Sequence, residues 1–225
     1  MEEVLNLISD SRLLAAKESY DKIMQSPDKC MQYADIISAN ETKLTTMVER
    51  CGHVNKALAL VAADNPDWIL ATNFLGVTTH YMLGDDGLLW VRMEATQSDV
   101  PVMEQMAVVY EVEWFKLWIP FCSDSRLISR ISHTELIAYA CISAPFGISR
   151  ECVVYAYGVD CIYENGSLVV LGESIDHYDN VDIPPCKGMF NKRATVKFSA
   201  VVTPFSPTSG HVSDNFWTHP YTPCL

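Results

Sequence analysis

The feature that most constrains the fold is the pair Asn165-Gly166, which lies between two apolar segments. An Asn-Gly pair favours a tight turn with positive φ, the kind that joins antiparallel strands. The flanking segments, 151–163 and 168–174, are rich in the Val, Tyr, Ile and Leu residues that strands favour. We therefore expect a hairpin here, within a protein built around an antiparallel sheet.

Both predicted strands are apolar at nearly every position over 153–157 and 168–171. A strand with one face in water alternates apolar and polar side chains, so a continuous apolar run indicates that both faces are covered. Packing against the N-terminal helices would cover the outer face. The inner face would line a cavity. These two explanations are compatible, and the sequence alone does not separate them.

Further strand and turn signals fill most of residues 66–205. The pattern predicts strands at 68–75, 77–83, 88–95, 136–143, 151–163, 168–174 and 194–203. The Gly84–Gly87 cluster is a turn signal, Pro101 opens a helix, and Ile175–Asn191 forms a long loop. This order predicts an α+β fold with a meandering antiparallel sheet, because hairpin connections dominate.

The first 65 residues are predicted to be helical instead. Ser26-Pro27 marks a helix start, because Ser can cap the first turn and Pro needs no N–H partner there. A later helix follows Asn40 and is expected to stop at Gly52, after which the apolar period resumes as far as Asn65-Pro66.

These signals divide the chain into three parts. Residues 1–65 form a helical segment that packs on the sheet domain, and residues 66–205 form the sheet domain itself. Residues 206–225 form an irregular tail, because Pro and Gly recur there and make regular structure unfavourable.

Composition excludes several classes of partner. A formal charge of −12 disfavours nucleic acid, because an acidic surface repels phosphate, and it disfavours a polybasic grip on anionic membranes. The sequence has no apolar run of the ~20 residues needed to span a bilayer, and we expect no signal peptide. The eight cysteines form no C-x-x-C pair, which predicts a reduced, cytoplasmic protein.

No motif for metal, phosphate or catalysis stands out. His177 beside Asp176 and Asp179 is the nearest approach to a ligand group, and a polar loop explains it better. The sequence has no glycine-rich phosphate loop and no G-x-S-x-G elbow. A Cys122–His133 couple is one of many chance pairs among eight Cys and six His. We expect no cofactor, no metal and no catalytic residue.

Two segments are more specific. Residues 111–122 hold two acids, two Trp, two Phe and a Pro, and residues 144–151 carry a Pro-Phe-Gly turn followed by Ser-Arg-Glu. With Trp68 before them and the strand-like 152–157 after them, this order resembles the START family of lipid-transfer domains over roughly residues 66–205. The resemblance implies a helix-grip fold, in which a curved antiparallel sheet wraps a helix around an apolar tunnel.

The sequence departs from the family pattern in places. Glu151 stands where the family has Asp. Sterol-binding members carry a buried Arg at the position of Ala156, with its acidic partner near Ile137, so the resemblance implies a pocket without an ion pair and a ligand more apolar than a sterol. The family closes its tunnel with a C-terminal helix, whereas 211–225 has no helical pattern. The tail or the N-terminal helices would replace that lid, or the chain is a truncated product.

Strand alternation predicts the residues that line the tunnel. If Ile137 and Ala156 point inward, their alternate neighbours do so too, and pairing through the hairpin extends the set. The predicted ligand-binding residues are Val108, Ile137, Tyr139, Cys141, Val154, Ala156, Val169, Leu171 and Phe198. Trp114 and Trp118 are expected to anchor the core rather than to contact a ligand.

We therefore expect the chain to bind and transfer a hydrophobic lipid in an internal cavity, without catalysis. The ligand would be a phospholipid, a sterol or another apolar small molecule, with transient membrane contact. One alternative is a protein-interaction module on the same fold, with a collapsed pocket and the helical segment as its docking surface. Another is an enzyme, such as a hydrolase or cyclase, on a related helix-grip scaffold.

Overall fold

The computed structural model describes residues 1–61, 67–84, 89–144, 148–186, 192–204 and 211–218. The chain separates into two compact units. The helical unit contains Met1–Asp64 together with Gly158–Val169, and the sheet unit contains Asn65–Tyr157 together with Val170–Leu225. We had expected the whole of 66–205 in one domain, but the structure groups 158–169 with the helices.

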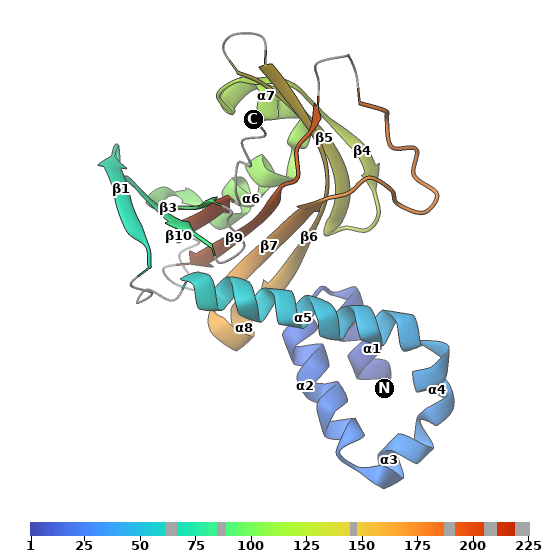
Figure 1. The fold of residues 1–225 in the computed structure, drawn as a ribbon. Helices are drawn as coiled ribbons and strands as arrows, with labels where there is room; N and C mark the ends of the chain where they lie inside the picture. The colour runs from blue at the N-terminus through green and yellow to red at the C-terminus, as the bar shows by residue number, and fades with distance from the viewer. Residues whose placement is uncertain (62–66, 85–88, 145–147, 187–191, 205–210, 219–225) are drawn as a thin grey trace. The chain divides into compact units, whose positions relative to one another are not determined.

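The N-terminal segment is helical, as predicted. Its helices are α1 (Glu2–Ser9), α2 (Leu13–Met24), α3 (Pro27–Gln32), α4 (Ala34–Ala39) and α5 (Glu41–Val61) (Figure 1). The predicted helix start is confirmed, because Ser26 precedes α3 and Pro27 is its first residue. The predicted stop at Gly52 is wrong, because α5 runs through it to Val61. A glycine inside a helix costs only about 1 kcal/mol, which packing along a long helix can offset.

Apolar side chains at helical spacing form the core of the helical unit. The buried residues of α5 are Leu44, Met47, Cys51, Val54 and Ala57. Steps of three and four residues put them along one side of the helix. Val4 of α1 and Leu13 of α2 are also buried, and the Cys51 thiol donates a hydrogen bond to the Leu13 carbonyl oxygen over 3.2 Å.

The predicted hairpin is confirmed between β6 (Ile148–Cys161) and β7 (Ser167–Ser174). Its turn contains one short helix, α8 (Ile162–Asn165), followed by Gly166 with φ of 79°. Glycine adopts this left-handed conformation without the penalty that a side chain brings. Asn165 Oδ1 accepts a hydrogen bond from the Ser167 N–H over 3.1 Å, which stabilises the turn.

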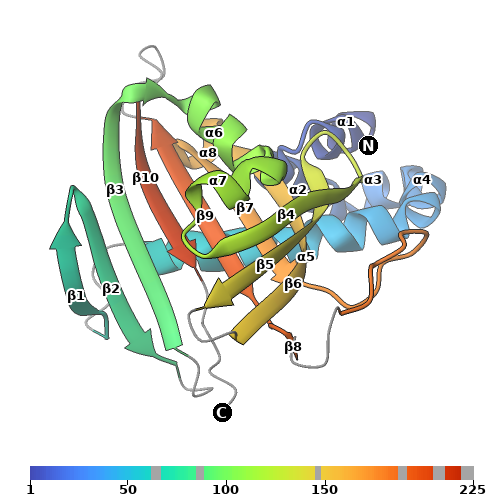
Figure 2. The same cartoon turned by 90° about the horizontal axis from the view of Figure 1, so that it is seen from above.

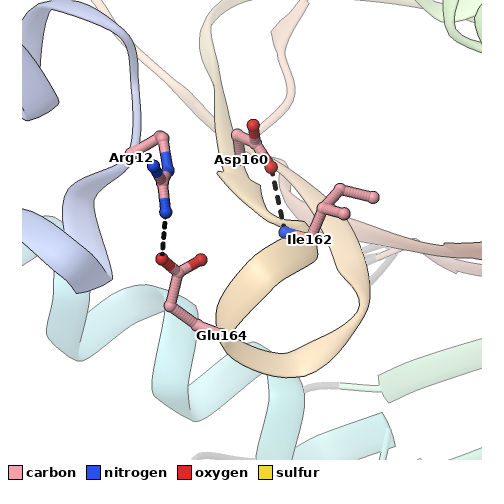
Figure 3. A network of polar contacts seen from close by, with 4 residues as sticks. All are labelled: Arg12, Asp160, Ile162 and Glu164. Atoms are coloured by element: carbon pink, nitrogen blue, oxygen red, sulfur yellow. Dashed lines mark hydrogen bonds and ion pairs between the residues drawn. The ribbon is translucent and has the colours of Figure 1, made fainter. Parts of the chain in front are cut away.

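Arg12, between α1 and α2, connects the hairpin tip to the helices (Figure 3). Its Nη2 lies 2.8 Å from Glu164 Oε1, and its guanidinium lies 4.8 Å from the centre of the Tyr163 ring. The Asp160 N–H also donates to the carbonyl oxygen of Ser11 over 3.0 Å. These contacts explain why the tip belongs to the helical unit.

Two buried thiols predict how the stability of the helical unit depends on pH. Burial raises the pKa of Cys51 to about 11 and that of Cys161 to about 12, from an ordinary value of 9.0. Below pH 9 both thiols are neutral in the folded and unfolded chain, so their contribution to stability is fully present. As the pH rises towards 11, the unfolded chain loses these protons first, and stability falls.

We therefore expect the free energy of unfolding, measured by urea titration of helical circular dichroism, to decline between pH 9 and 11. The decline should be shallower in Cys51→Ala and in Cys161→Ala than in the parent chain. Cys30→Ala is the matched control, because Cys30 lies in the same helical unit and is only partly buried. An unchanged slope in both buried-site variants would contradict the assignment.

The sheet unit consists mainly of antiparallel strands (Figure 2). Besides β6 and β7, they are β1 (Ile69–Phe74), β2 (Val77–Leu83), β3 (Leu89–Pro101), β4 (Cys122–Arg130), β5 (Glu135–Ala144), β8 (Lys192–Arg193), β9 (Lys197–Pro204) and β10 (His211–Thr218). Their order is β1-β2-β3-β10-β9-β7-β6-β5-β4, and β8 pairs in parallel with β6. The predicted α+β class with an antiparallel sheet is confirmed.

Three strands of this sheet, β4, β10 and the two-residue β8, were not predicted. β4 was missed because Ser, Asp and Arg occupy six of its nine positions and leave no apolar alternation. β10 lies within the segment that we predicted to be an irregular tail, and this prediction is wrong for 211–218. β10 pairs with β3 on one side and β9 on the other. Such backbone pairing with distant strands leaves no local signal in the sequence.

The predicted loops lie only partly within the described residues. Residues 175–186 carry no helix or strand, as expected, whereas 187–191 lie outside the described residues. Within the predicted Gly84–Gly87 turn, residues 85–87 also lie outside them, although β2 and β3 pair antiparallel as a hairpin requires.

A helical connection links β3 to β4. It consists of α6 (Val102–Tyr110), the short 3-10 helix η1 (Val112–Trp114) and α7 (Phe115–Trp118). α6 begins at the residue after Pro101, as predicted. Figures 1 and 2 show α6 and α7 on the concave side of the curved sheet. This connection therefore defines which face of the sheet is internal.

Candidate lipid-binding face

Hydrogen bonds to the helical connection identify the inner face of β4, β5 and β6. Ser125 Oγ accepts from the Lys116 N–H over 3.1 Å and donates to the Glu113 carbonyl oxygen over 3.3 Å. Ser125 is paired with Ala140 on β5, and directly opposed residues in antiparallel strands share a face. We call this the inner face.

Strand register then assigns the other inner-face residues. Ala140 is paired with Cys152, and two residues away Ala138 is paired with Val154 and Leu136 with Ala156. In the other direction, Ile142 is paired with Arg150. The inner-face set on β5 and β6 is thus Leu136, Ala138, Ala140, Ile142, Arg150, Cys152, Val154 and Ala156. Most of these side chains are small, and all but the buried Leu136 are only partly buried.

The outer face of the same strands carries larger, more deeply buried side chains. Ile137 and Tyr139 are paired with Tyr155 and Val153. Ile137, Tyr139, Cys141 and Val153 form a buried cluster, against which side chains of the 175–183 loop pack. The Tyr155 and Tyr178 rings stack there with centroids 5.4 Å apart. This face is already filled by protein.

The register corrects the predicted ligand-binding set. We assumed that Ile137 and Ala156 point the same way, but Ala156 is paired with Leu136, so the two lie on opposite faces. A shift of one residue moves every side chain of a strand to the other face. Val154 and Ala156 therefore lie on the inner face, whereas Ile137, Tyr139 and Cys141 lie on the outer face.

Two further predicted residues also lie elsewhere than on the inner face. The Ile175 N–H donates to the Val153 carbonyl oxygen over 2.9 Å, which pairs these residues. Alternation along β7 then puts Leu171 on the outer face with Ile175. Val169 is fully buried and groups with the helical unit.

Phe198 of β9 lies on the inner face, in the direction predicted. A Cβ atom added to Gly172 would lie 2.3 Å from Cε1 of the Phe198 ring, so the ring covers this glycine. Gly172 follows Leu171 and therefore faces inward. The close approach explains why a residue without a side chain occupies this strand position.

This contact predicts that Gly172→Ala destabilises the protein by about 1–3 kcal/mol, because the Phe198 ring must move. The same substitution in a Phe198→Ala background should cost less, since the ring is gone. Urea unfolding of the four proteins measures both values. Gly52→Ala is the opposite control: its added Cβ meets no atom within 4 Å, and a helical alanine should stabilise. If Gly172→Ala lowered the free energy of unfolding equally with and without the Phe198 ring, the contact between the two residues would be contradicted.

The segment that links β3 to β4 exposes several apolar residues, which was not predicted. Met103, Val108, Trp114, Leu117, Trp118 and Phe121 have exposed fractions between 49% and 72%. We call these residues the helix patch. Our expectation that Trp114 and Trp118 anchor the core is wrong, because 56% and 49% of their surfaces are exposed. Val108, which we predicted to contact ligand, belongs to this patch.

Along the paired stretch of β5 and β6, the described inner-face positions are uncharged except for Arg150, which is paired with Ile142. Ala156 is paired with Leu136, so the position where sterol-binding START domains are expected to hold an ion pair is apolar on both strands. The buried charges of the sheet unit include Glu151, on the outer face of β6, and Arg92 of β3. Arg92 pairs with Glu94, and His80 Nδ1 lies 3.9 Å from Glu94 Oε2. The sequence pattern gave no sign of this cluster.

The residues considered for catalysis show no catalytic arrangement. Cys122 is the first residue of β4, whereas His133 follows the last residue of that strand, and burial raises the pKa of the Cys122 thiol. His177 Nε2 lies 3.2 Å from Asp179 Oδ1 in a pair that is mostly in solvent. No group of three His, Cys, Asp or Glu side chains in the described residues could hold a metal ion.

No helix among the described residues has both the length and the apolar character to cross a membrane.

Solved structures share this arrangement of strands and helices. A STAR-related lipid transfer protein from Xanthomonas axonopodis (fragment 25–204) aligns with a TM-score of 0.57 and 21% identity, over 68% of this chain and 81% of that one. Human STARD10 aligns with a TM-score of 0.59 and 16% identity, over 76% and 67%. Human StAR-related lipid transfer protein 5 gives 0.55 and 16%, over 77% and 80%.

The chain has the START fold. No family model matches the sequence, and neither does any curated protein. At these identities the likeness establishes the START fold alone. It confirms the predicted helix-grip class, with a curved antiparallel sheet, a helix on its inner face and an N-terminal helical segment.

Proposed function

We propose that the chain binds one hydrophobic lipid on the inner face of β4, β5 and β6 and carries it between membranes without catalysing a reaction. The observation that supports this most is the contrast between the two faces. Large side chains fill the outer face, whereas Ala138, Ala140 and Ala156 give the inner face small side chains that are only partly buried. The START fold, which the chain shares with proteins described as lipid transfer proteins, supports the same proposal.

The energetics favour an occupant. Hiding ~500 Å² of apolar ligand surface from water contributes about 12 kcal/mol before the costs of association. An empty lipid-sized apolar cavity of ~500 Å³ would cost roughly 10 kcal/mol by extrapolation from small cavities. Because Leu136 and Ala156 offer no charge, the ligand would be held by apolar contact, which favours an acyl chain over a ligand anchored through a hydroxyl.

The helix patch would make the transient membrane contact. Trp, Leu and Phe are the residues that insert at the membrane–water interface, and Trp114, Leu117, Trp118 and Phe121 are all exposed. Phe121 has φ of 63°, an unfavourable conformation for a bulky residue, and strain of this kind marks functional positions. The charge of −12 favours a zwitterionic over an anionic surface.

We place this activity in the cytoplasm, because the described cysteines form no disulfide, as reducing conditions would ensure. Phospholipids, sterols and other apolar small molecules are the ligand classes to be compared, and nucleic acid is not expected to bind.

Two experiments together test the proposal. Native mass spectrometry of the purified full chain should show a lipid adduct, and fluorescent phospholipid should move from donor to acceptor vesicles faster with protein than without it. A chain that retains no lipid and binds none of a panel of phospholipids, sterols and ceramides would contradict the proposal. That outcome would favour the protein-interaction module with a collapsed pocket.

A further inference from the structure

β1 forms one edge of the sheet and has no covering element among the described residues. It is the first strand in the sheet order, paired only with β2. All six of its residues are exposed, including Ile69, Leu70 and Phe74 with exposed fractions of 53%, 59% and 68%. An edge strand presents backbone N–H and C=O groups that can pair with another strand, and natural proteins usually protect such edges.

The opposite edge of the same sheet is β4, which has features that protect an edge strand from pairing. β4 carries Asp124, Arg126 and Arg130, and its Ser125 is hydrogen-bonded to the helical connection. By contrast, residues 68–83, which contain β1 and β2, include no Asp, Glu, Lys or Arg. Charged side chains oppose edge pairing, so only β4 carries this safeguard.

The turn after β1 gives a second, independent observation. Leu75 has φ of 51°, is 84% exposed and precedes Gly76 with φ of 79°. Turns with two positive φ values favour Asn-Gly or Asp-Gly, and a leucine there carries both a backbone and a solvation penalty. An asparagine at position 75 would remove both the backbone penalty and the solvation penalty. The presence of leucine therefore needs an explanation, and burial against a partner would provide one.

We infer that β1 pairs antiparallel with β1 of a second copy of this chain. A two-fold axis through the middle of the strand pairs Ile69 of one copy with Leu75 of the other, and Leu70 with Phe74. Each end of the paired strands is therefore apolar, and the middle is polar. This pattern is self-complementary, as a two-fold interface requires. The absence of charge matters because each chain carries −12, and like charges elsewhere would oppose association.

The test is the association state of the full chain, measured by sedimentation velocity up to roughly hundreds of micromolar, since a small interface binds weakly. Phe74→Lys should weaken dimerisation at least about tenfold, because each dimer buries two lysines against apolar strand ends. Leu83→Lys is the matched control: Leu83 is 73% exposed at the end of the neighbouring strand β2. It should associate like the parent chain.

Hydrogen exchange of the unmodified chain provides a readout that does not depend on either variant folding. The amides of 69–74 should become protected as concentration rises, while those of β4 do not change. A chain that stays monomeric throughout would overturn the inference. So would equal weakening by both lysine variants, undiminished association of Phe74→Lys, or concentration-dependent protection confined to other segments.

Discussion

Ala156→Phe is expected to lower the affinity for lipid at least about tenfold while leaving the chain folded. Ala156 lies on the inner face, opposite Leu136 and beside other small side chains. A phenylalanine there would occupy the space that we assign to the ligand. Overfilling a packed site costs about 1–3 kcal/mol, which corresponds to roughly 5- to 150-fold in affinity.

The measurement is equilibrium titration with a fluorescent phospholipid, accompanied by thermal unfolding to show that the variant is folded. Ala39→Phe is the matched control, because Ala39 is exposed on α4 in the helical unit and the chemical change is the same. We expect the control to bind like the parent chain. If Ala156→Phe binds lipid with unchanged affinity and remains folded, the inner face of β5 and β6 is not the binding site.

The second large effect is expected from charge on the helix patch. Trp114→Glu combined with Trp118→Glu should reduce transfer between zwitterionic vesicles at least tenfold, because moving carboxylates into the membrane interface costs several kcal/mol. Equilibrium binding of a soluble short-chain lipid should fall much less, since neither Trp lies on the inner-face strands. Transfer rate and binding affinity would thus respond differently.

Met31→Glu provides the control for that variant. Met31 is 81% exposed on α3 of the helical unit, so it tests whether removing exposed apolar surface anywhere slows transfer. We expect Met31→Glu to bind vesicles in a flotation assay, and to transfer lipid between vesicles, as well as the parent chain does. Equal losses in the Trp variant and the Met31 variant, or parental transfer by the Trp variant, would contradict a membrane contact through the helix patch.

Local signals in the sequence were sufficient for much of the fold. Asn165-Gly166 identified the hairpin because its turn needs a residue that tolerates positive φ, and Ser26-Pro27 identified the start of α3. β10 was not predicted because the strands that pair with it, β3 and β9, lie elsewhere in the sequence. The role of 158–169 in the helical unit depends on Arg12 reaching Glu164, which no local pattern encodes.

The candidate site was less predictable, and for a specific reason. Alternation identifies which residues share a face within one strand, but it does not fix the register between strands. Pairing Ile137 with Ala156 was wrong by one residue, and that error moved Ile137, Tyr139 and Cys141 to the wrong face. The exposed Trp114 and Trp118 were missed because large aromatic residues are buried in most proteins.

The most direct test of the inner face as a lipid site is photocrosslinking with a phospholipid that carries a diazirine near the middle of its acyl chain. After irradiation and proteolysis, we predict adducts on inner-face residues of β5 and β6, such as Ala140 and Val154, and on Phe198. Excess unlabelled lipid should suppress them. Adducts confined to the helical unit or to β1 and β2, or labelling that excess lipid does not suppress, would contradict the account.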